Sequence, residues 1–181
     1  DFLKKENVTA TYITLGTNVN KYPDLVKREF DEGHYVANHG YSHKYSTVYA
    51  SPEATLNEYN YTEDAIRKAL GNNSYMSKLF RFPGGSNGGY YDEAKQNSKA
   101  LLHENGIMHL DWNSLSSDAA GAKTKEALLQ NVKDTMGEKE IVVILMHDSS
   151  DKILTYEMLS DLISYLKEKG YKFENIYDLL D

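Results

Sequence analysis

The alternation of strand-like and helix-like segments is the feature that most constrains the fold of this 181-residue chain. Segments rich in β-branched and aromatic residues alternate six times with segments whose apolar residues follow helical spacing. The continuous apolar run from Ile141 to Leu145 is typical of a parallel strand that is buried on both faces. Parallel strands need long crossover connections, which helices usually provide. The pattern therefore predicts an α/β fold with a parallel sheet or barrel.

Local sequence signals set the expected boundaries of these elements. Ser51, Pro52 and Glu53 provide an N-cap, a first-turn proline and an early acid for a helix that reaches Leu70. Glycines follow several of the other helical segments, as is common at helix ends. We expect strands at residues 9–15, 34–37, 79–82, 107–111, 141–145 and 171–173, and helices at residues 22–32, 51–70, 92–104, 124–136 and 153–169.

The alternation begins irregularly at the amino end. Residues 1–6 have a helix-like pattern, whereas a regular strand–helix series begins with a strand. The first residue is Asp1 and not methionine. We therefore expect a first strand to be missing before Asp1, where a signal or anchor would also lie.

Size and composition limit the number of domains and the class of partner. A chain of this length with 40% hydrophobic residues is expected to form one domain, residues 1–181. Its formal net charge of −7 offers no basic stripe, so we expect no nucleic-acid partner. No apolar run approaches the roughly 18 residues of a membrane span. The absence of cysteine excludes thiolate metal sites and permits either a cytoplasmic or a secreted protein.

Charged and imidazole side chains gather where successive expected strands end. Active sites of parallel sheets and barrels form from the loops at this end of the strands. Two histidines four residues apart can bind one metal ion, and catalytic zinc usually has three protein ligands, so a third ligand must come from elsewhere. The residues in question are His39 and His43, Arg81, Asp118, and His147.

Each of these side chains also has a structural explanation. His39 and His43 could be ordinary loop residues, and Arg81 could form a structural ion pair. Asp118 could lie in a loop or at the start of a helix, and His147 could be a histidine of the core. The turn Pro83-Gly84-Gly85 fits a tight connection, although its glycines would also let backbone N–H groups approach an oxyanion. The remaining histidines, which we assign to structural positions, are His34, His103 and His109.

Four segments together resemble the motifs of the polysaccharide deacetylase family, also called the NodB-homology domain or carbohydrate esterase family four. Residues 36–43 are similar to its metal-binding histidine motif, with Gly40 where serine or threonine is usual. Residues 80–85 resemble its arginine-proline-glycine motif, and residues 145–147 its leucine-x-histidine motif. Residues 111–118 look like the segment whose aspartate orients the catalytic histidine. The motifs occur in the family's order over nearly the whole chain.

The resemblance implies a distorted (β/α) barrel and a divalent metal, usually Zn²⁺, with Co²⁺, Mn²⁺ or Ni²⁺ as alternatives. It implies that His39 and His43 are metal ligands and that His147 is the general acid, with Asp118 as its charge partner. Arg81 would position the catalytic-base aspartate of the family.

The resemblance also assigns residues to the substrate. The backbone N–H of Gly84 would help to hold the oxyanion, and Leu145 would line the pocket for the acetyl methyl group. Trp112 would contact the substrate as well. Ala119 follows Asp118 where many members of the family have tryptophan, so one wall of the groove is expected to differ.

The family's first motif is absent from this sequence. That motif, Thr-Phe-Asp-Asp-Gly, supplies the catalytic base and the third metal ligand. General base assistance is typically worth about 10²–10⁴-fold, so we expect the 181-residue chain by itself to be poorly active. Trimming, natural loss of the first strand, or completion by a separate peptide would each explain the absence, and we favour trimming.

By resemblance, the expected reaction is metal-dependent hydrolysis of N-acetyl, or O-acetyl, groups on a cell-wall or extracellular polysaccharide. The expected partner is peptidoglycan or a chitin-like oligomer that contains N-acetylglucosamine, and the expected location is outside the cell or at its surface. Two alternatives remain open. One is a non-catalytic carbohydrate-binding module that uses some of the 15 tyrosines as sugar platforms, and the other is a metal-dependent amidohydrolase for a small amide.

Overall fold

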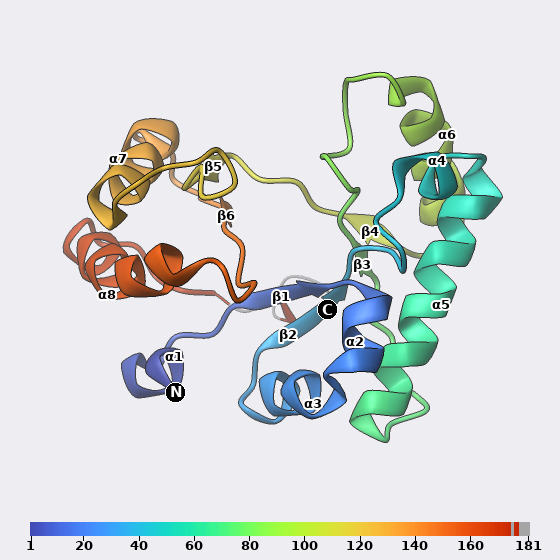
Figure 1. Ribbon diagram of the computed structural model, residues 1–181, viewed down its shortest axis with the longest axis horizontal. Coiled ribbons are helices and arrows are strands. Elements are labelled where there is room, and N and C mark those ends of the chain that lie inside the picture. The colour runs from blue at the N-terminus through green and yellow to red at the C-terminus, as the bar shows by residue number, and fades with distance from the viewer. Residues whose placement is uncertain (175, 178–181) are drawn as a thin grey trace. The chain divides into compact units, whose positions relative to one another are not determined.

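The computed structural model describes residues 1–174 and 176–177. Contacts divide the chain into two compact units, Asp1–Asp111 together with the segment from residue 173 onward, and Trp112–Lys172. We describe each unit by itself. The order of elements in the first unit is α1 (Phe2–Glu6), β1 (Thr11–Thr14), α2 (Gly16–Lys21), α3 (Pro23–Asp31), β2 (Tyr35–Asn38), α4 (Tyr45–Val48), α5 (Pro52–Leu70), β3 (Leu79–Phe80), α6 (Asp92–Glu104) and β4 (Met108–His109), as Figure 1 shows.

A parallel sheet in the order β1-β2-β3-β4 forms the centre of the first unit. β1 pairs with β2 from Thr11↔Tyr35 to Thr14↔Asn38, and β3 pairs with β4 through Phe80↔His109. β2 is buried at all four positions, as expected of an inner parallel strand. Because the strands are parallel, their carboxyl ends lie along one edge of the sheet. The predicted parallel α/β arrangement is confirmed.

Helix α5 packs mainly against α2, α3 and α6, and it has the ends that its sequence predicts. The Ser51 side chain accepts a hydrogen bond from Ala54 N at 3.2 Å, Pro52 is the first helical residue, and Gly71 ends the helix at φ 63°. Its apolar face packs into two clusters, each large side chain contributing about 1.5–3 kcal/mol when fully buried. The first cluster includes Val19, Val36, Ala65, Ile66 and Leu70, and the second includes Val48, Tyr49, Tyr59, Phe80, Phe82 and Leu102.

The second unit contains β5 (Ser114–Leu115), α7 (Lys125–Met136), β6 (Ile144–Leu145) and α8 (Ile153–Glu168). β5 and β6 pair in parallel through Ser114↔Ile144 and Leu115↔Leu145. Thr124 caps α7 by accepting a hydrogen bond from Ala127 N at 3.2 Å. The core of this unit consists of Leu128, Val132, Met136, Met158, Leu162, Ile163 and Leu166 from the two helices.

Two predictions about the second half of the chain are wrong. The run at 141–145 is not a strand buried on both faces, because only Ile144 and Leu145 are extended in β6 and both are half-buried. Ile141 is 78% exposed. Among the residues that the structure describes, β6 pairs only with β5, so no described strand lies on its second side.

The second error is the strand expected at residues 171–173. The Tyr171 N–H donates to the Leu166 carbonyl at 3.0 Å, which ends α8, and the Tyr171 hydroxyl donates to the Lys139 carbonyl. Because of these contacts, the segment forms the turn that ends α8, and residues 171–174 contain no strand. Within the described residues, no helix is both long and apolar enough to cross a membrane.

Candidate functional site

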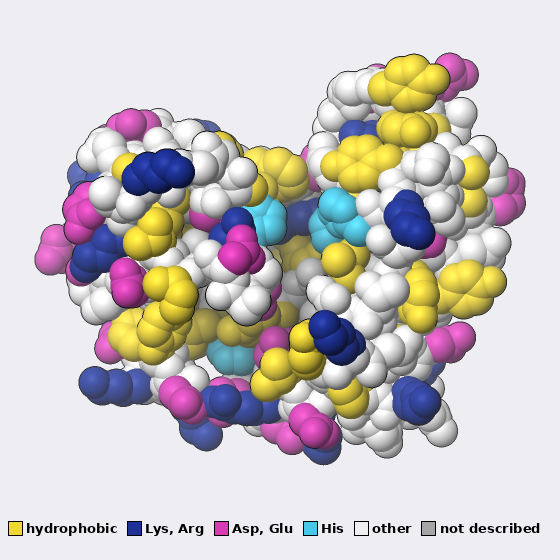
Figure 2. Space-filling view, in the orientation of Figure 1, with side chains coloured by type: hydrophobic (Ala, Val, Ile, Leu, Met, Phe, Trp, Pro, Cys, Tyr) yellow, Lys and Arg dark blue, Asp and Glu magenta, His cyan; other side chains and the backbone are white. Residues whose placement is uncertain are grey.

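The pair His39 and His43 lies at the carboxyl end of β2. His39 N donates to the Thr14 carbonyl at 3.0 Å, which continues the sheet pairing one residue beyond the strand. The two imidazole centroids are 5.0 Å apart, with the rings inclined at 59°. His43 is exposed, and Figure 2 shows histidine side chains at the surface beside a group of hydrophobic side chains over α4.

The orientation of the His39 ring is set by the neighbouring strand. Its Nδ1 lies 2.7 Å from the Arg81 carbonyl, and since a carbonyl can only accept, Nδ1 carries the proton. The neutral ring then has its lone pair on Nε2, which is the form that a metal-ligating histidine takes. His39 and Arg81 are thus linked through the β2–β3 edge that also joins Arg81 N to the Asn38 carbonyl at 2.9 Å.

Glu58, on helix α5, holds the loop between the two histidines. Its Oε2 accepts hydrogen bonds from the backbone N–H groups of Tyr41 and Ser42, both at 2.7 Å. Hydrogen bonds to a charged group contribute more than neutral ones, about 1.5–3 kcal/mol. The carboxylate therefore fixes the path of the chain from His39 to His43.

A second carboxylate of α5, Glu63, fixes the residue that precedes His39. Glu63 is fully buried and accepts from the Asn38 side chain at 2.9 Å, from Ser77 Oγ at 2.6 Å and from Ser77 N at 3.0 Å. The Asn38 side chain in turn accepts from Gly40 N at 2.9 Å. This network satisfies the buried carboxylate without a positive charge and closes a turn around His39.

The sequence reasoning missed Glu58, Glu63 and Asn38. The available signal was the presence of two acids on the face of α5 that also carries Thr55, Tyr59, Thr62 and Ile66, because carboxylates on a buried face need partners. The sequence did not show where those partners lie, since they are 14 to 25 residues away along the chain.

The donor set of this loop suits two of the ligands that a zinc ion takes. Neutral imidazole nitrogens are common ligands of Zn²⁺, and a catalytic zinc usually has three protein ligands. Across residues 1–174 and 176–177, no three His, Cys, Asp or Glu side chains are grouped so that they could hold a metal ion. His39 and His43 thus fit a partial site that needs a further ligand.

Arg81 follows β3 and is buried at 9% exposure. Its Nε donates to the Leu110 carbonyl at 3.0 Å and its Nη2 to the Asp111 carbonyl at 3.4 Å. Burial lowers the pKa of the Arg81 guanidinium to about 10, against the opposing effect of the Asp111 carboxylate. The guanidinium remains charged at neutral pH and lies on the same edge of the sheet as His39.

Gly84 lies in a tight turn directly after this strand. The Gly85 N–H closes the turn on the Phe82 carbonyl at 2.8 Å, and Gly84 has a φ of 76°, which glycine adopts most readily. Among the described residues, no hydrogen bond uses the Gly84 N–H. That donor is therefore available to an acceptor from outside the chain.

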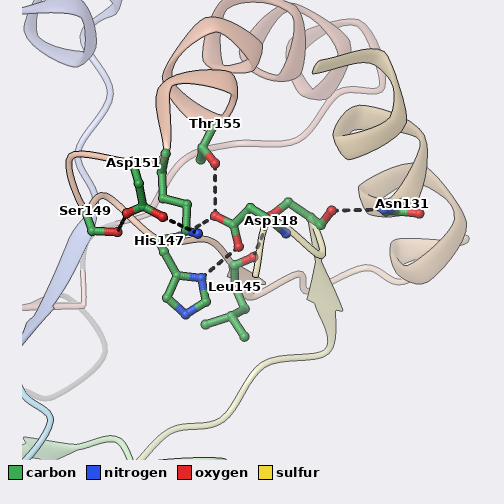
Figure 3. Close-up of polar contacts among 9 residues, drawn as sticks. Asp118, Asn131, Leu145, His147, Ser149, Asp151 and Thr155 are labelled. Carbon is green, nitrogen blue, oxygen red and sulfur yellow. Dashed lines mark hydrogen bonds and ion pairs between the residues drawn. The ribbon is translucent and has the colours of Figure 1, made fainter. Parts of the chain in front are cut away.

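In the second unit, His147 and Asp118 form a hydrogen-bonded pair (Figure 3). His147 Nδ1 lies 2.7 Å from Asp118 Oδ1, and the backbone N–H of His147 donates to Asp118 Oδ2 at 2.7 Å. Thr155 Oγ1 donates to the same Oδ2 at 3.0 Å. The Asp118 side chain is only 4% exposed, whereas the His147 side chain is 46% exposed. The pair thus combines a buried carboxylate with an imidazole that reaches solvent.

The contacts of Asp118 control its charge. Burial acts to raise its pKa, but the hydrogen bonds from the His147 side chain and backbone, and from Thr155, outweigh burial and lower the pKa. Asp118 is therefore ionised at neutral pH and accepts the proton of His147 Nδ1, which leaves Nε2 as the nitrogen that can exchange a proton with a ligand.

Leu145 and Trp112 also lie in the second unit. The Leu145 carbonyl accepts from Ser116 N at 3.2 Å, which ties β6 to the segment that carries Asp118. Figure 3 shows the Leu145 side chain and the His147 ring on the same side of the Asp118 carboxylate. Trp112 is half-buried at the start of the unit. The predicted residues thus form one group in each unit, with His39, His43, Arg81 and Gly84 in the first and Asp118, Leu145 and His147 in the second.

The other histidines lie elsewhere in the first unit. His34 is buried, and its Nδ1 accepts from Ala10 N at 3.2 Å. His103 and His109 contact each other, with Nε2 and Nδ1 3.0 Å apart.

Comparison with known proteins assigns these features to a family. The family model for polysaccharide deacetylase matches residues 1–105. A peptidoglycan-N-acetylglucosamine deacetylase from Bacillus cereus is 34% identical over 97% of this chain and 62% of its own length. The chain thus spans less than two thirds of that relative.

Solved structures share the fold. One is an esterase of carbohydrate esterase family four (CE4) from Streptococcus mutans, with a TM-score of 0.87 and 28% identity. The match covers 97% of this chain and 77% of that one. A CE4 family pseudoenzyme from Bacillus anthracis has a TM-score of 0.78 and 28% identity, covering 99% of this chain and 58% of that one. The expected α/β fold of the deacetylase type is confirmed.

Proposed function

The chain belongs to the polysaccharide deacetylase family, and on that premise we propose that its parent protein removes acetyl groups from a cell-wall polysaccharide. The observation that carries this proposal is the pair of Asp118 and His147, with a buried carboxylate holding an exposed imidazole at 2.7 Å. The named activity of the Bacillus cereus relative supports N-acetylglucosamine in peptidoglycan as the substrate. In this hydrolysis the oxygen of a water molecule bonds to the acetyl carbonyl carbon and the C–N bond breaks, which yields acetate and a free amine.

His147 is the proposed general acid. Asp118 fixes the ring so that Nδ1 donates to the carboxylate, and stabilises the positive charge when Nε2 is also protonated. The protonated Nε2 then gives its proton to the leaving sugar nitrogen. Proton transfer by a positioned side chain is typically worth about 10²–10⁴-fold in rate.

His39 and His43 are the proposed histidine ligands of a divalent metal, with Zn²⁺ as the first choice. When bound, such an ion polarises the carbonyl of the acetamido group and lowers the pKa of water. The Arg81 carbonyl holds the His39 ring in the required tautomer, and the Glu58 carboxylate holds the loop that brings His43 to it. A third ligand and a catalytic base are proposed to come from the family's Asp-Asp motif, which Arg81 would position.

The remaining residues are proposed to contact the substrate. The Gly84 N–H, which no described group accepts, would donate to the oxyanion that forms on the acetyl carbonyl. Leu145 would line the pocket for the acetyl methyl group, and Trp112 would lie against the sugar. A location outside the cell or at its surface follows from the polymeric substrate and is part of the proposal.

A second candidate is a non-catalytic carbohydrate-binding protein. It is favoured by one observation, the structural similarity to a CE4 family pseudoenzyme. The two candidates differ in whether acetate is produced, since both would bind the glycan.

The experiment that tests the proposal measures acetate release from N-acetylglucosamine oligomers with added zinc. It compares the 181-residue chain with a version extended at its amino end through the preceding coding sequence. Acetate release by the extended version, with little or none from the chain alone, is the expected result. Glycan binding without acetate release in both versions would favour the binding protein.

A further inference from the structure

Tyr45 is held between the histidine loop and the turn that contains Gly84. Its ring lies 5.7 Å from that of His43, 5.7 Å from that of Tyr49 and 6.2 Å from that of Tyr91, all in edge-to-face arrangements. Such contacts fix the orientation of an aromatic ring. Tyr45 is nevertheless 39% exposed, so part of this fixed ring faces solvent.

The hydroxyl of Tyr45 lies directly against the Gly84 turn. A Cβ atom at Gly84 would be 2.5 Å from the Tyr45 hydroxyl oxygen, closer than any real contact allows. The turn is also held by a second tyrosine, because the buried Tyr49 hydroxyl donates a hydrogen bond to the Pro83 carbonyl at 2.6 Å. A side chain at 84 would therefore force Tyr45 to shift, and the φ of 76° separately favours glycine at this position.

The Tyr45 hydroxyl has no hydrogen-bond partner within the described part of the chain. The hydroxyls of Tyr49 and Tyr75, by contrast, both donate to backbone carbonyls. A hydroxyl that is fixed, partly exposed and lacks a protein partner can donate to a ligand at little cost in conformational entropy.

The aromatic surface continues beyond Tyr45. Tyr91 contacts Tyr45 and also Tyr90, whose ring centroid is 5.0 Å away at an interplanar angle of 84°. Tyr90 is 95% exposed. Figure 2 shows hydrophobic side chains gathered over α4 and the segment that leads to α6, beside histidine side chains. Tyrosine rings with an apolar face and a polar tip suit the mixed surface of a pyranose.

We propose that Tyr45 is a substrate-binding residue, with its hydroxyl donating to the sugar that carries the acetyl group and its ring packing against that sugar. Tyr90 extends the same surface to a neighbouring sugar of the polymer. The inference rests on the proposed function and deepens it, because it specifies an oligosaccharide ligand in preference to a small amide. It also assigns part of the binding energy to the first unit alone.

The test uses the tetramer of N-acetylglucosamine as the probe and measures its affinity by protein NMR titration in the presence of zinc. Tyr45→Phe removes only the hydroxyl, and we expect it to weaken binding about two- to tenfold, the range of one hydrogen bond. Tyr45→Ala and Tyr90→Ala are expected to weaken it by roughly tenfold or more. Tyr156→Ala is the matched control, because Tyr156 is 63% exposed on α8 in the second unit.

Zinc affinity and the thermal unfolding midpoint of each variant are measured in parallel. Tyr45→Phe keeps the ring contacts, so its zinc affinity and its unfolding midpoint are expected to match those of the unsubstituted chain. Unchanged tetramer affinity in Tyr45→Phe and Tyr90→Ala, or no binding of the tetramer by the parent chain, would overturn the inference.

Acetate release separates this inference from the proposed function. If tetramer binding depends on Tyr45 but the extended protein releases no acetate, the sugar-binding role of Tyr45 is supported and the proposed deacetylase activity is contradicted. If the extended protein releases acetate with the same KM with and without Tyr45→Phe, the proposed deacetylase activity is supported and the sugar-binding role of the Tyr45 hydroxyl is contradicted.

Discussion

The carboxylate of Glu58 accepts a hydrogen bond of 2.7 Å from the backbone N–H of Tyr41, and through this contact helix α5 determines the geometry of the histidine loop. The same oxygen accepts from Ser42 N, so the carboxylate is shared by two consecutive amides. Neither amide donates to a backbone carbonyl of the described chain. Removal of this acceptor leaves two partly buried donors without their partner.

Glu58→Gln is therefore expected to lower both stability and metal affinity. An amide oxygen is a weaker acceptor than a carboxylate, and we expect a loss of about 1–3 kcal/mol in the free energy of unfolding. Urea denaturation and zinc titration measure the two effects. Glu157→Gln, an exposed position on α8, is the control and should change neither. Zinc affinity equal to that of the parent chain would show that Glu58 does not position His39 and His43.

Gly40→Ser restores the residue type that is usual in the family, and we expect it to destabilise this chain. Gly40 has a φ of 81°, and an added Cβ would lie 3.4 Å from Glu58 Oε2. The left-handed conformation costs a non-glycine residue about 1–2 kcal/mol. Gly33→Ser is a matched control at φ 84°, where an added Cβ meets nothing within 4 Å. A larger fall in urea midpoint for Gly40→Ser than for Gly33→Ser is expected; equal falls would exclude crowding against Glu58.

Asp118→Asn tests the orientation of the proposed acid. The carboxylate accepts from the ring and backbone of His147 and from Thr155, and an amide cannot accept all three equally well. We expect acetate release by the extended protein to fall about 10- to 100-fold, mainly in kcat. Thr155→Val removes one donor and leaves the contact with His147, so its effect should be smaller. A Thr155→Val loss as large as that of Asp118→Asn would contradict the separate role of the His147 contact.

His34 makes the stability of the fold depend on pH. Burial lowers its pKa below the ordinary value of 6.5, an effect that Glu32 opposes and the amino terminus supports. Below pH 6.5 the unfolded chain binds the proton more readily than the folded chain. The contribution of neutral His34 is therefore complete above pH 6.5 and is lost as the pH falls through the lower folded pKa.

The prediction is a decrease in urea midpoint as the pH falls below 6.5. His34→Asn keeps a side-chain acceptor for Ala10 N and removes the titration, so its midpoint should depend less on pH in this range. His109→Asn measures the contribution of His109, a second histidine whose pKa is lowered by burial. The same pH dependence in His34→Asn as in the parent chain would assign the effect elsewhere.

The features that could be predicted from the sequence are those with local causes. The ends of α5 follow from Ser51, Pro52 and Gly71. Because parallel strands end at one edge, the position of His39 beside Arg81 followed from the strand assignments alone. The pairing of Asp118 with His147 was expected only from the family resemblance.

The features that could not be predicted depend on distant contacts. The partners of Glu58 and Glu63 lie on other elements, and nothing in the local sequence of α5 identifies them. The run at 141–145 has the composition of a fully buried strand, but burial depends on which strands pair beside it, and Ile141 is exposed. The contact of Tyr45 with Gly84 likewise joins the start of α4 to a turn that lies 39 residues further along the sequence.

The central claim is that His147, held by Asp118, donates a proton in the removal of acetyl groups. The most direct measurement is acetate release from N-acetylglucosamine oligomers by the extended protein with zinc, compared with its His147→Ala variant. We predict a loss of about 10²–10⁴-fold with zinc affinity unchanged. Near-normal acetate release by His147→Ala, with zinc bound as in the parent protein, would contradict the claim.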